Sequence, residues 1–85
     1  MVTNKHLDIP PISEQAQLIK PGQYQHFKGG MYEVMGVGRL SEDQSQEMVI
    51  YKSQETGYTW LRPLKMFLEN VERDGYSGPR FTKIN

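Results

Sequence analysis

The chain has 85 residues, which suits one small domain and is too short for two. Ten Lys and Arg balance ten Asp and Glu, so the net charge of zero removes the long-range field that draws proteins to nucleic acid or anionic membranes, while a local basic patch stays open. The chain has no Cys, which excludes disulfides and thiolate chemistry. No signal peptide, lipidation motif or apolar run of the roughly 20 residues that a membrane span needs is visible, so we expect a cytoplasmic protein.

Residues 1–21 are predicted to form an N-terminal extension. Two consecutive prolines favour extended backbone in residues 1–12, either as a strap across the domain or as a disordered arm. From Ser13 the sequence SEQAQLIK has a good N-cap residue, an early Glu and strong helix formers before a Pro-Gly pair. About two turns of helix are expected there.

Residues 22–85 are predicted to form a domain of short antiparallel strands, because apolar runs alternate with glycine-containing turns. Residues 23–28 and 31–37 flank the pair Gly29-Gly30, which supplies the positive φ values of a two-residue hairpin turn.

This turn predicts the register of the hairpin. With a two-residue loop, Phe27 lies opposite Tyr32 and shares an inner face with it and with Val34. His26 then lies opposite Glu33 on the other face, as an ordinary cross-strand contact.

The middle of the chain is expected to contain a loop and two strands. Residues 38–47 (GRLSEDQSQE) are polar and acidic, so we predict an exposed, mobile loop. Residues 48–53 (MVIYKS) form the next strand, although four apolar residues in a row leave its inward face open. The sequence QETG then turns the chain into a strand over residues 58–62.

A helical turn follows this strand. Pro63 suits the first position of a helix, so residues 63–67 are predicted to form one α or 3₁₀ turn. Leu64, Phe67 and Leu68 are spaced to face inward together.

The C-terminal region returns to β-structure. Residues 69–73 are predicted to be a strand, Asp74-Gly75 is a strong turn signal, and residues 80–84 close the sheet. Five or six short strands suit a small curled barrel.

The order of motifs YQHFKGGMYEVMGV, VIYKS, WLRPLKMFLENV, DG and PRF resembles the small bacterial domain of unknown function family numbered 1653. The resemblance covers about residues 22–84, and it implies an SH3-type barrel while implying no activity. Phe27 stands where the family pattern often has Tyr. The residues that match the pattern are Tyr32, Glu33, Trp60, Arg62, Pro63, Met66 and Phe67.

The strand over residues 58–62 offers two interpretations. Tyr58, Trp60 and Arg62 share one face, and Leu61 points the other way. If Leu61 is buried, the other three form an outward stripe that could stack on a base or grip a peptide. We expect Trp60 in the core, because the one Trp of a small protein is worth about 3–5 kcal/mol as a core anchor. The candidate binding residues are Tyr32, Glu33, Tyr58, Trp60, Arg62 and Lys65.

No catalytic, metal or cofactor site is predicted. His26 and Glu33 on an open sheet face lack a nucleophile, an oxyanion site and a cleft. A His-based metal site has no supporting cluster, and the methionines are expected to fill gaps in the core and at its rim.

The leading hypothesis is therefore a non-enzymatic module that binds a protein or peptide over an aromatic face. The alternatives are a weak nucleic-acid binder and an accessory metabolite-binding domain; an enzyme comes last, because so small a domain rarely encloses a dry pocket. The nucleic-acid alternative uses Arg39, Arg62, Lys65 and Arg80. The oligomeric state is open, since an unpaired strand edge would join two copies unless the N-terminal helix covers it.

Overall fold

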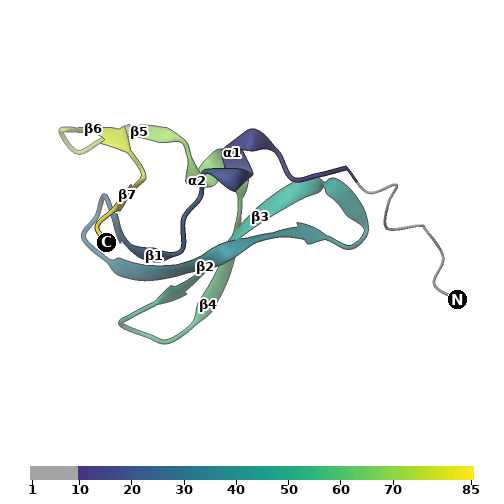
Figure 1. Cartoon of the computed structure of the whole chain (residues 1–85). Helices are drawn as coiled ribbons and strands as arrows, with labels where there is room; N and C mark the ends of the chain where they lie inside the picture. The colour runs from purple at the N-terminus through teal and green to yellow at the C-terminus, as the bar shows by residue number, and fades with distance from the viewer. Residues whose placement is uncertain (1–9) are drawn as a thin grey trace, which may run out of the picture.

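The computed structural model describes residues 10–85 and is mainly β (Figure 1). This part of the chain has two helices of four residues each and seven strands, rather than the five or six predicted. Their bounds are α1 Glu14–Gln17, β1 Gly22–His26, β2 Met31–Leu40, β3 Asp43–Ser53, β4 Thr59–Pro63, α2 Leu64–Phe67, β5 Asn70–Arg73, β6 Tyr76–Pro79 and β7 Phe81–Lys83. Most of the predicted strap or arm, residues 1–9, lies outside the described residues.

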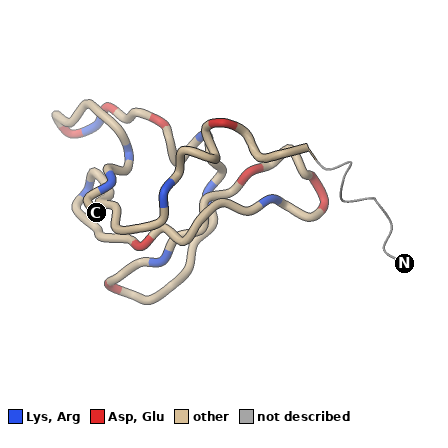
Figure 2. Tube along the Cα trace, in the orientation of Figure 1, with Lys and Arg blue, Asp and Glu red and all other residues tan. Residues whose placement is uncertain are grey.

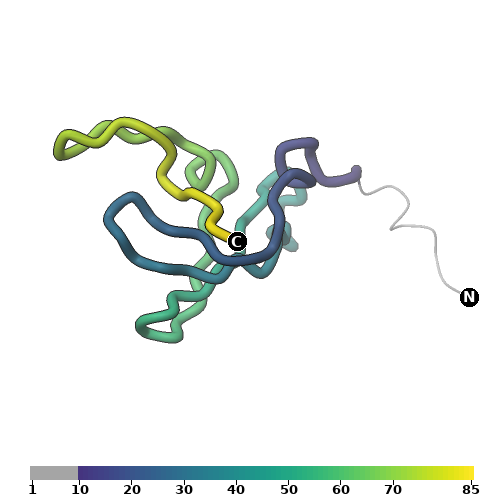
Figure 3. The backbone as a smooth tube through the Cα atoms, turned by 60° about the vertical axis from the view of Figure 1, so that its left-hand side comes forward, coloured from purple at the N-terminus to yellow at the C-terminus, as the bar shows by residue number. Residues whose placement is uncertain are grey.

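Five strands form one antiparallel sheet in the order β4-β3-β2-β1-β7, and β5 and β6 form a separate two-stranded sheet. Both views of the backbone show β5–β6 and α1 on the same side of β1 and β2, while the β3–β4 hairpin projects away from them (Figures 1 and 3). Within residues 10–85, β4 and β7 are the two edges of the larger sheet and do not pair with each other. The described strands therefore form a curled open sheet and no closed barrel.

The β1–β2 hairpin has a longer loop than predicted. Tyr24 lies opposite Tyr32, where Phe27 was predicted. The His26 N–H donates to the Gly30 carbonyl at 2.8 Å, which leaves a three-residue loop that ends at Gly29, with a φ of 109°. The predicted two-residue turn is wrong, because the register differs by three positions and an odd shift exchanges the two faces of a strand.

This shift changes which rings enter the core. Tyr24 joins Tyr32 and Val34 on the inner face of the sheet. Phe27, which was predicted on that face, lies in the loop and stacks on Tyr76 with the ring centroids 5.4 Å apart.

The predicted mobile loop over residues 38–47 is also wrong. Strand β2 runs to Leu40 and β3 begins at Asp43, so a tight hairpin replaces the loop. Arg39 pairs with Glu47 in this extension. Most of its side chains are exposed, as the polar composition predicted. The segment is nevertheless a strand pair, because its backbone groups hydrogen-bond across the ladder between β2 and β3.

Several other strands and turns lie where they were predicted. Residues 48–53 belong to β3, and residues 54–57 form the turn that leads into β4. Asp74 and Gly75 have φ values of 53° and 81°, as a hairpin turn with two left-handed residues requires. The expected final strand over residues 80–84 is β7, which pairs with β1.

The core lies between the inner face of the sheet and the two helices. Its buried residues are Ala16, Tyr24, Val34, Val49, Tyr51, Leu64, Phe67 and Phe81. Phe81 stacks on Phe67, with 4.3 Å between ring centroids, and meets Tyr51 edge to face at 5.4 Å. Ile12 and Ile19 pack against this cluster, so the described part of the N-terminal extension contributes to the core.

Both helices are short. The Ser13 hydroxyl accepts a hydrogen bond from the Ala16 N–H at 3.1 Å, which confirms the predicted N-cap, but α1 has one turn rather than two. Helix α2 begins at Leu64 rather than at the predicted Pro63, which ends β4 and is the N-cap; Leu64 and Phe67 are buried as predicted. Leu68 is 46% exposed, so its predicted burial is wrong; it is the C-cap residue after the last residue of the helix.

Charged residues of both signs are interspersed along the described trace (Figure 2). In the described part of the chain, positive and negative charges are thus not separated onto opposite sides, and the net charge is zero. Neither described helix has the length and apolar character needed to cross a membrane.

Candidate functional site

Strand β4 and Tyr58, the residue before it, carry exposed aromatic side chains. Trp60 is 50% exposed and Tyr58 is 65% exposed, although Trp60 pairs with the buried Tyr51 and lies on the inner face. No element of the described chain covers these rings, because β4 is an edge strand on a projecting hairpin (Figure 1). The expectation of Trp60 in the core is therefore wrong. Leu61, on the opposite face, is also exposed, at 58%.

Three aromatic side chains share the inner face at this end of the sheet. Tyr58 and Trp60 meet edge to face with 6.4 Å between their centroids. The Ser53 N–H donates to the Tyr58 carbonyl at 2.9 Å, and Ser53 pairs with Tyr32 on its other side. A small buried serine thus lies between the tyrosines. We call this region, formed by Tyr32, Tyr58 and Trp60, the aromatic surface.

Arg62 lies at the rim of the aromatic surface. Its Nε donates to the Tyr51 hydroxyl at 2.9 Å, and its guanidinium carbon lies 5.7 Å from the centroid of the Phe81 ring. The hydrogen bond and the cation–π contact hold the guanidinium in one place. Arg62 shares a face with Trp60, as alternation along the strand predicted.

Glu33 does not join the other candidates. It is exposed and pairs with Lys52, on the face opposite to that of its neighbour Tyr32. The predicted contact between His26 and Glu33 is wrong, because the observed register places Gln23 opposite Glu33.

His26 lies on the inner face among cations. Its ring meets Phe81 edge to face at 5.0 Å, and its Nδ1 accepts a hydrogen bond from the Lys28 N–H at 3.1 Å. Burial lowers the pKa of His26, and the positive charges of Arg62, Arg80 and Lys28 lower it further. Folding therefore favours the neutral imidazole of His26 over its protonated form, relative to the unfolded chain.

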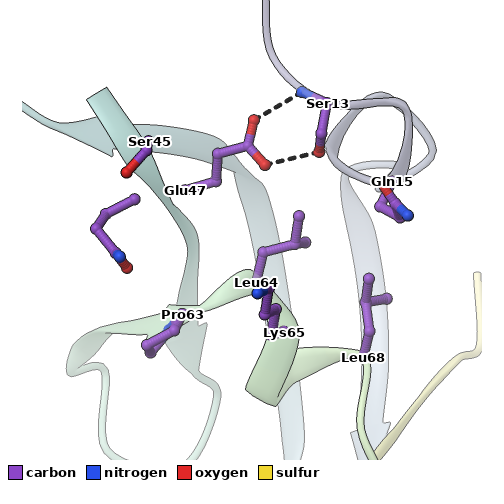
Figure 4. A pocket seen from close by; sticks show the side chains of 9 residues that line it. Ser13, Gln15, Ser45, Glu47, Pro63, Leu64, Lys65 and Leu68 are labelled. Carbon is purple, nitrogen blue, oxygen red and sulfur yellow. Dashed lines mark hydrogen bonds between the residues drawn. The ribbon is translucent and has the colours of Figure 1, made fainter. Parts of the chain in front are cut away.

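Lys65 lines a groove of about 620 Å³ between α1, β3 and α2 (Figure 4). The Ser13 N–H and hydroxyl donate to the Glu47 carboxylate at 2.7 and 2.6 Å, across one side of this groove. These hydrogen bonds lower the pKa of the Glu47 carboxyl. Leu64 and Leu68 supply apolar lining. Lys65 thus belongs to the groove and lies outside the aromatic surface.

Sequence reasoning missed Glu47 and found Ser13 only as a helix cap. Thirty-four positions separate the two residues, and no local pattern indicates their contact. Among residues 10–85, no group of three His, Asp or Glu side chains is placed to hold a metal ion.

The four cations proposed for nucleic-acid binding are not brought together. Arg39 lies in the β2–β3 hairpin, and Lys65 lines the groove. Arg62 and Arg80 both lie near the same histidine ring. Arg80 also forms an ion pair with Glu69 at 2.8 Å, which neutralises part of its charge.

Comparison with known proteins places the chain. The family described as "Protein of unknown function (DUF1653)" matches residues 22–83. The chain belongs to this family. It is similar to the crystal structure of a DUF1653 protein from Bordetella bronchiseptica, with a TM-score of 0.73 and 28% sequence identity over 81% of this chain and 91% of that chain. No curated protein matches the chain.

The resemblance inferred from the order of motifs is thereby confirmed. The DUF1653 match includes the whole aromatic surface and Arg62. It begins after α1, so Ser13 and the α1 side of the groove lie outside it. Of the two regions, the aromatic surface is the one that lies entirely within the DUF1653 domain.

Proposed function

We propose that this DUF1653 protein is a non-enzymatic interaction module that binds an extended segment of another protein, or a short peptide, on the aromatic surface. The observation that carries the proposal is that Trp60 is half-exposed. A chain this small would be expected to bury its single Trp in the core, because few aromatic rings are available to build it. Trp, Tyr and Arg are the residues most enriched at binding hot spots.

The geometry supports recognition with little reorganisation. Tyr58 and Trp60 already contact each other, and Arg62 is held by a hydrogen bond and a ring face. Side chains fixed before binding lose less conformational entropy when a ligand arrives. A peptide that presents an apolar side chain and a carboxylate matches this combination of rings and guanidinium.

The test begins with selection of peptides from a random displayed library against the immobilised full chain. Binding of a selected peptide is then measured by calorimetry and by chemical-shift perturbation. Trp60→Ala is expected to weaken binding by at least about 30-fold, as for a hot spot of about 2 kcal/mol. Met35→Ala is the matched control, because it truncates an apolar side chain that is 45% exposed and lies outside the aromatic surface. A folded Trp60→Ala protein that binds like wild type would remove Trp60 from the site.

Weak RNA binding is a second candidate, which the proximity of Arg62 and Arg80 to one ring supports. Its mark is a log–log salt slope of about 0.7 for each phosphate of a single strand that the protein neutralises. Binding to oligonucleotides that is absent, or insensitive to salt, rules this candidate out.

An accessory metabolite-binding role would use the groove instead, whose volume of about 620 Å³ falls in the range of small-molecule sites. We also propose that the fold is a variant of the SH3-type barrel with its edges unjoined, and that the module works in the bacterial cytoplasm, where a chain without Cys needs no oxidant.

A further inference from the structure

The outer edge of β4 is free of strand partners in the part of the chain that the structure describes. The Ser53 N–H donates to the Tyr58 carbonyl, and the same register continues along β4 to Arg62. In an antiparallel pair, alternate residues exchange hydrogen bonds with the neighbouring strand. The N–H and C=O groups of Thr59 and Leu61 therefore point away from β3, toward the open side.

We propose that this edge pairs with the same edge of a second copy of the chain, antiparallel and around a twofold axis at Trp60. Thr59 of each copy then lies opposite Leu61 of the other, and their outward groups form four backbone hydrogen bonds. Trp60 faces Trp60 of the second copy in a non-hydrogen-bonded pair, where opposite side chains approach most closely.

The side chains of residues 58–62 favour a second copy over an unrelated strand, because the pairing is self-complementary. Tyr58 lies opposite Arg62 of the second copy, which sets an aromatic ring beside a guanidinium. Thr59 meets Leu61, and no like charges face each other. A twofold interface requires this property, since the same patch must fit itself.

The edge also lacks the usual protection against pairing. Natural edge strands carry lysine, proline or bulges that prevent association. Residues 59–62 contain no lysine or proline and pair with β3 without a bulge. Pro63 ends the strand, so the interface is short and the dimer is weak and dependent on concentration. Pairing would join the two aromatic surfaces on one face of the combined sheet. The proposed dimer does not depend on the proposed function.

The experiment is analytical ultracentrifugation of the full chain from micromolar to millimolar concentration, with the fluorescence of Trp60 as a second readout. The apparent mass is expected to rise from 9.9 kDa toward twice that value, and the Trp60 emission is expected to shift to shorter wavelength. Leu61→Pro removes one outward N–H and leaves the hydrogen bonds to β3 intact. Leu61→Ala is its control, because it shortens the same side chain and keeps the N–H.

Leu61→Pro is expected to stay at 9.9 kDa throughout, while Leu61→Ala keeps the rise in mass. Thr59→Pro is a second variant that removes an equivalent outward N–H, in case the first does not fold. The inference is overturned if wild type remains a monomer at every concentration, or if the folded proline variants associate as Leu61→Ala does. A monomeric wild type that still binds a selected peptide would overturn the dimer and leave the proposed function standing.

Discussion

Truncation of two aromatic side chains provides the sharpest test of where the core ends. Phe81 is 7% exposed, stacks on Phe67 and lies against the rings of Tyr51 and His26. Trp60 is 50% exposed on an edge strand. Phe81→Ala is therefore expected to cost much more stability than Trp60→Ala, although Trp is the larger residue.

The magnitudes follow from burial. A fully buried Trp removes about 200 Å² from water, so half burial at about 25 cal/mol per Å² gives at most roughly 2.5 kcal/mol for Trp60. No enclosed cavity adds to that figure at an open edge. Phe81→Ala empties a buried site and is expected to cost about 4–5 kcal/mol. A chain of this length is stable by about 4–13 kcal/mol, so Phe81→Ala removes a large part of the total.

The assay is urea unfolding followed by far-ultraviolet circular dichroism, because Trp60→Ala removes the fluorescent probe. At about 1 kcal/mol per molar urea, the two midpoints should differ by about 2 M, with Trp60→Ala the more stable. The samples are kept dilute so that association does not contribute. Equal losses for the two variants would show that Trp60 is a core residue and would refute the argument from exposure.

Three further predictions concern local features. The Ser13 hydrogen bonds to the Glu47 carboxylate stabilise the fold fully above the ordinary carboxyl pKa of 4.5, and this stabilisation is lost as the pH falls through the lower pKa of the folded protein. An NMR titration of the Ser13 amide should show this step, and Glu47→Gln should abolish it. The pKa of His26 is lowered in the folded protein, so the contribution of His26 to stability is complete above the unfolded pKa of 6.5 and declines as the pH falls toward the folded pKa. His26→Gln should flatten this part of the plot of urea midpoint against pH, and an unchanged slope would contradict the prediction. A Cβ at Gly22 would overlap a backbone carbonyl oxygen of the last residue, whereas the space around Gly29 is open. Gly22→Ala should therefore cost over about 2 kcal/mol in thermal or urea unfolding and Gly29→Ala about 1 kcal/mol, and equal costs would exclude the steric explanation.

Local signals in the sequence were sufficient wherever the structure depends on a few neighbouring residues. Ser13 caps α1 through a residue three positions away, and Asp74-Gly75 forms its turn from its own backbone preferences. The strand over residues 48–53, strand β4 and the motif order that identifies the DUF1653 family were likewise readable from the chain. Alternation correctly placed Trp60 and Arg62 on one face, because the period of a strand is a property of its backbone.

The candidate site was only partly predictable. Tyr58, Trp60 and Arg62 could be grouped from their spacing, and Tyr32 approaches them only because β2 pairs with β3. Glu33, which matches the family pattern, was a candidate beside Tyr32, yet neighbouring residues of a strand point to opposite faces.

The sequence alone indicated most of the strand segments, the Asp74-Gly75 turn and the face that Tyr58, Trp60 and Arg62 share. The tertiary structure decided the β1–β2 register, the contact of Ser13 with Glu47 and the exposure of Trp60. The physical reason is that alternation is local, whereas burial depends on whether another element covers a face. Strand β4 lies at an uncovered edge of the described sheet, so its rings remain available for binding.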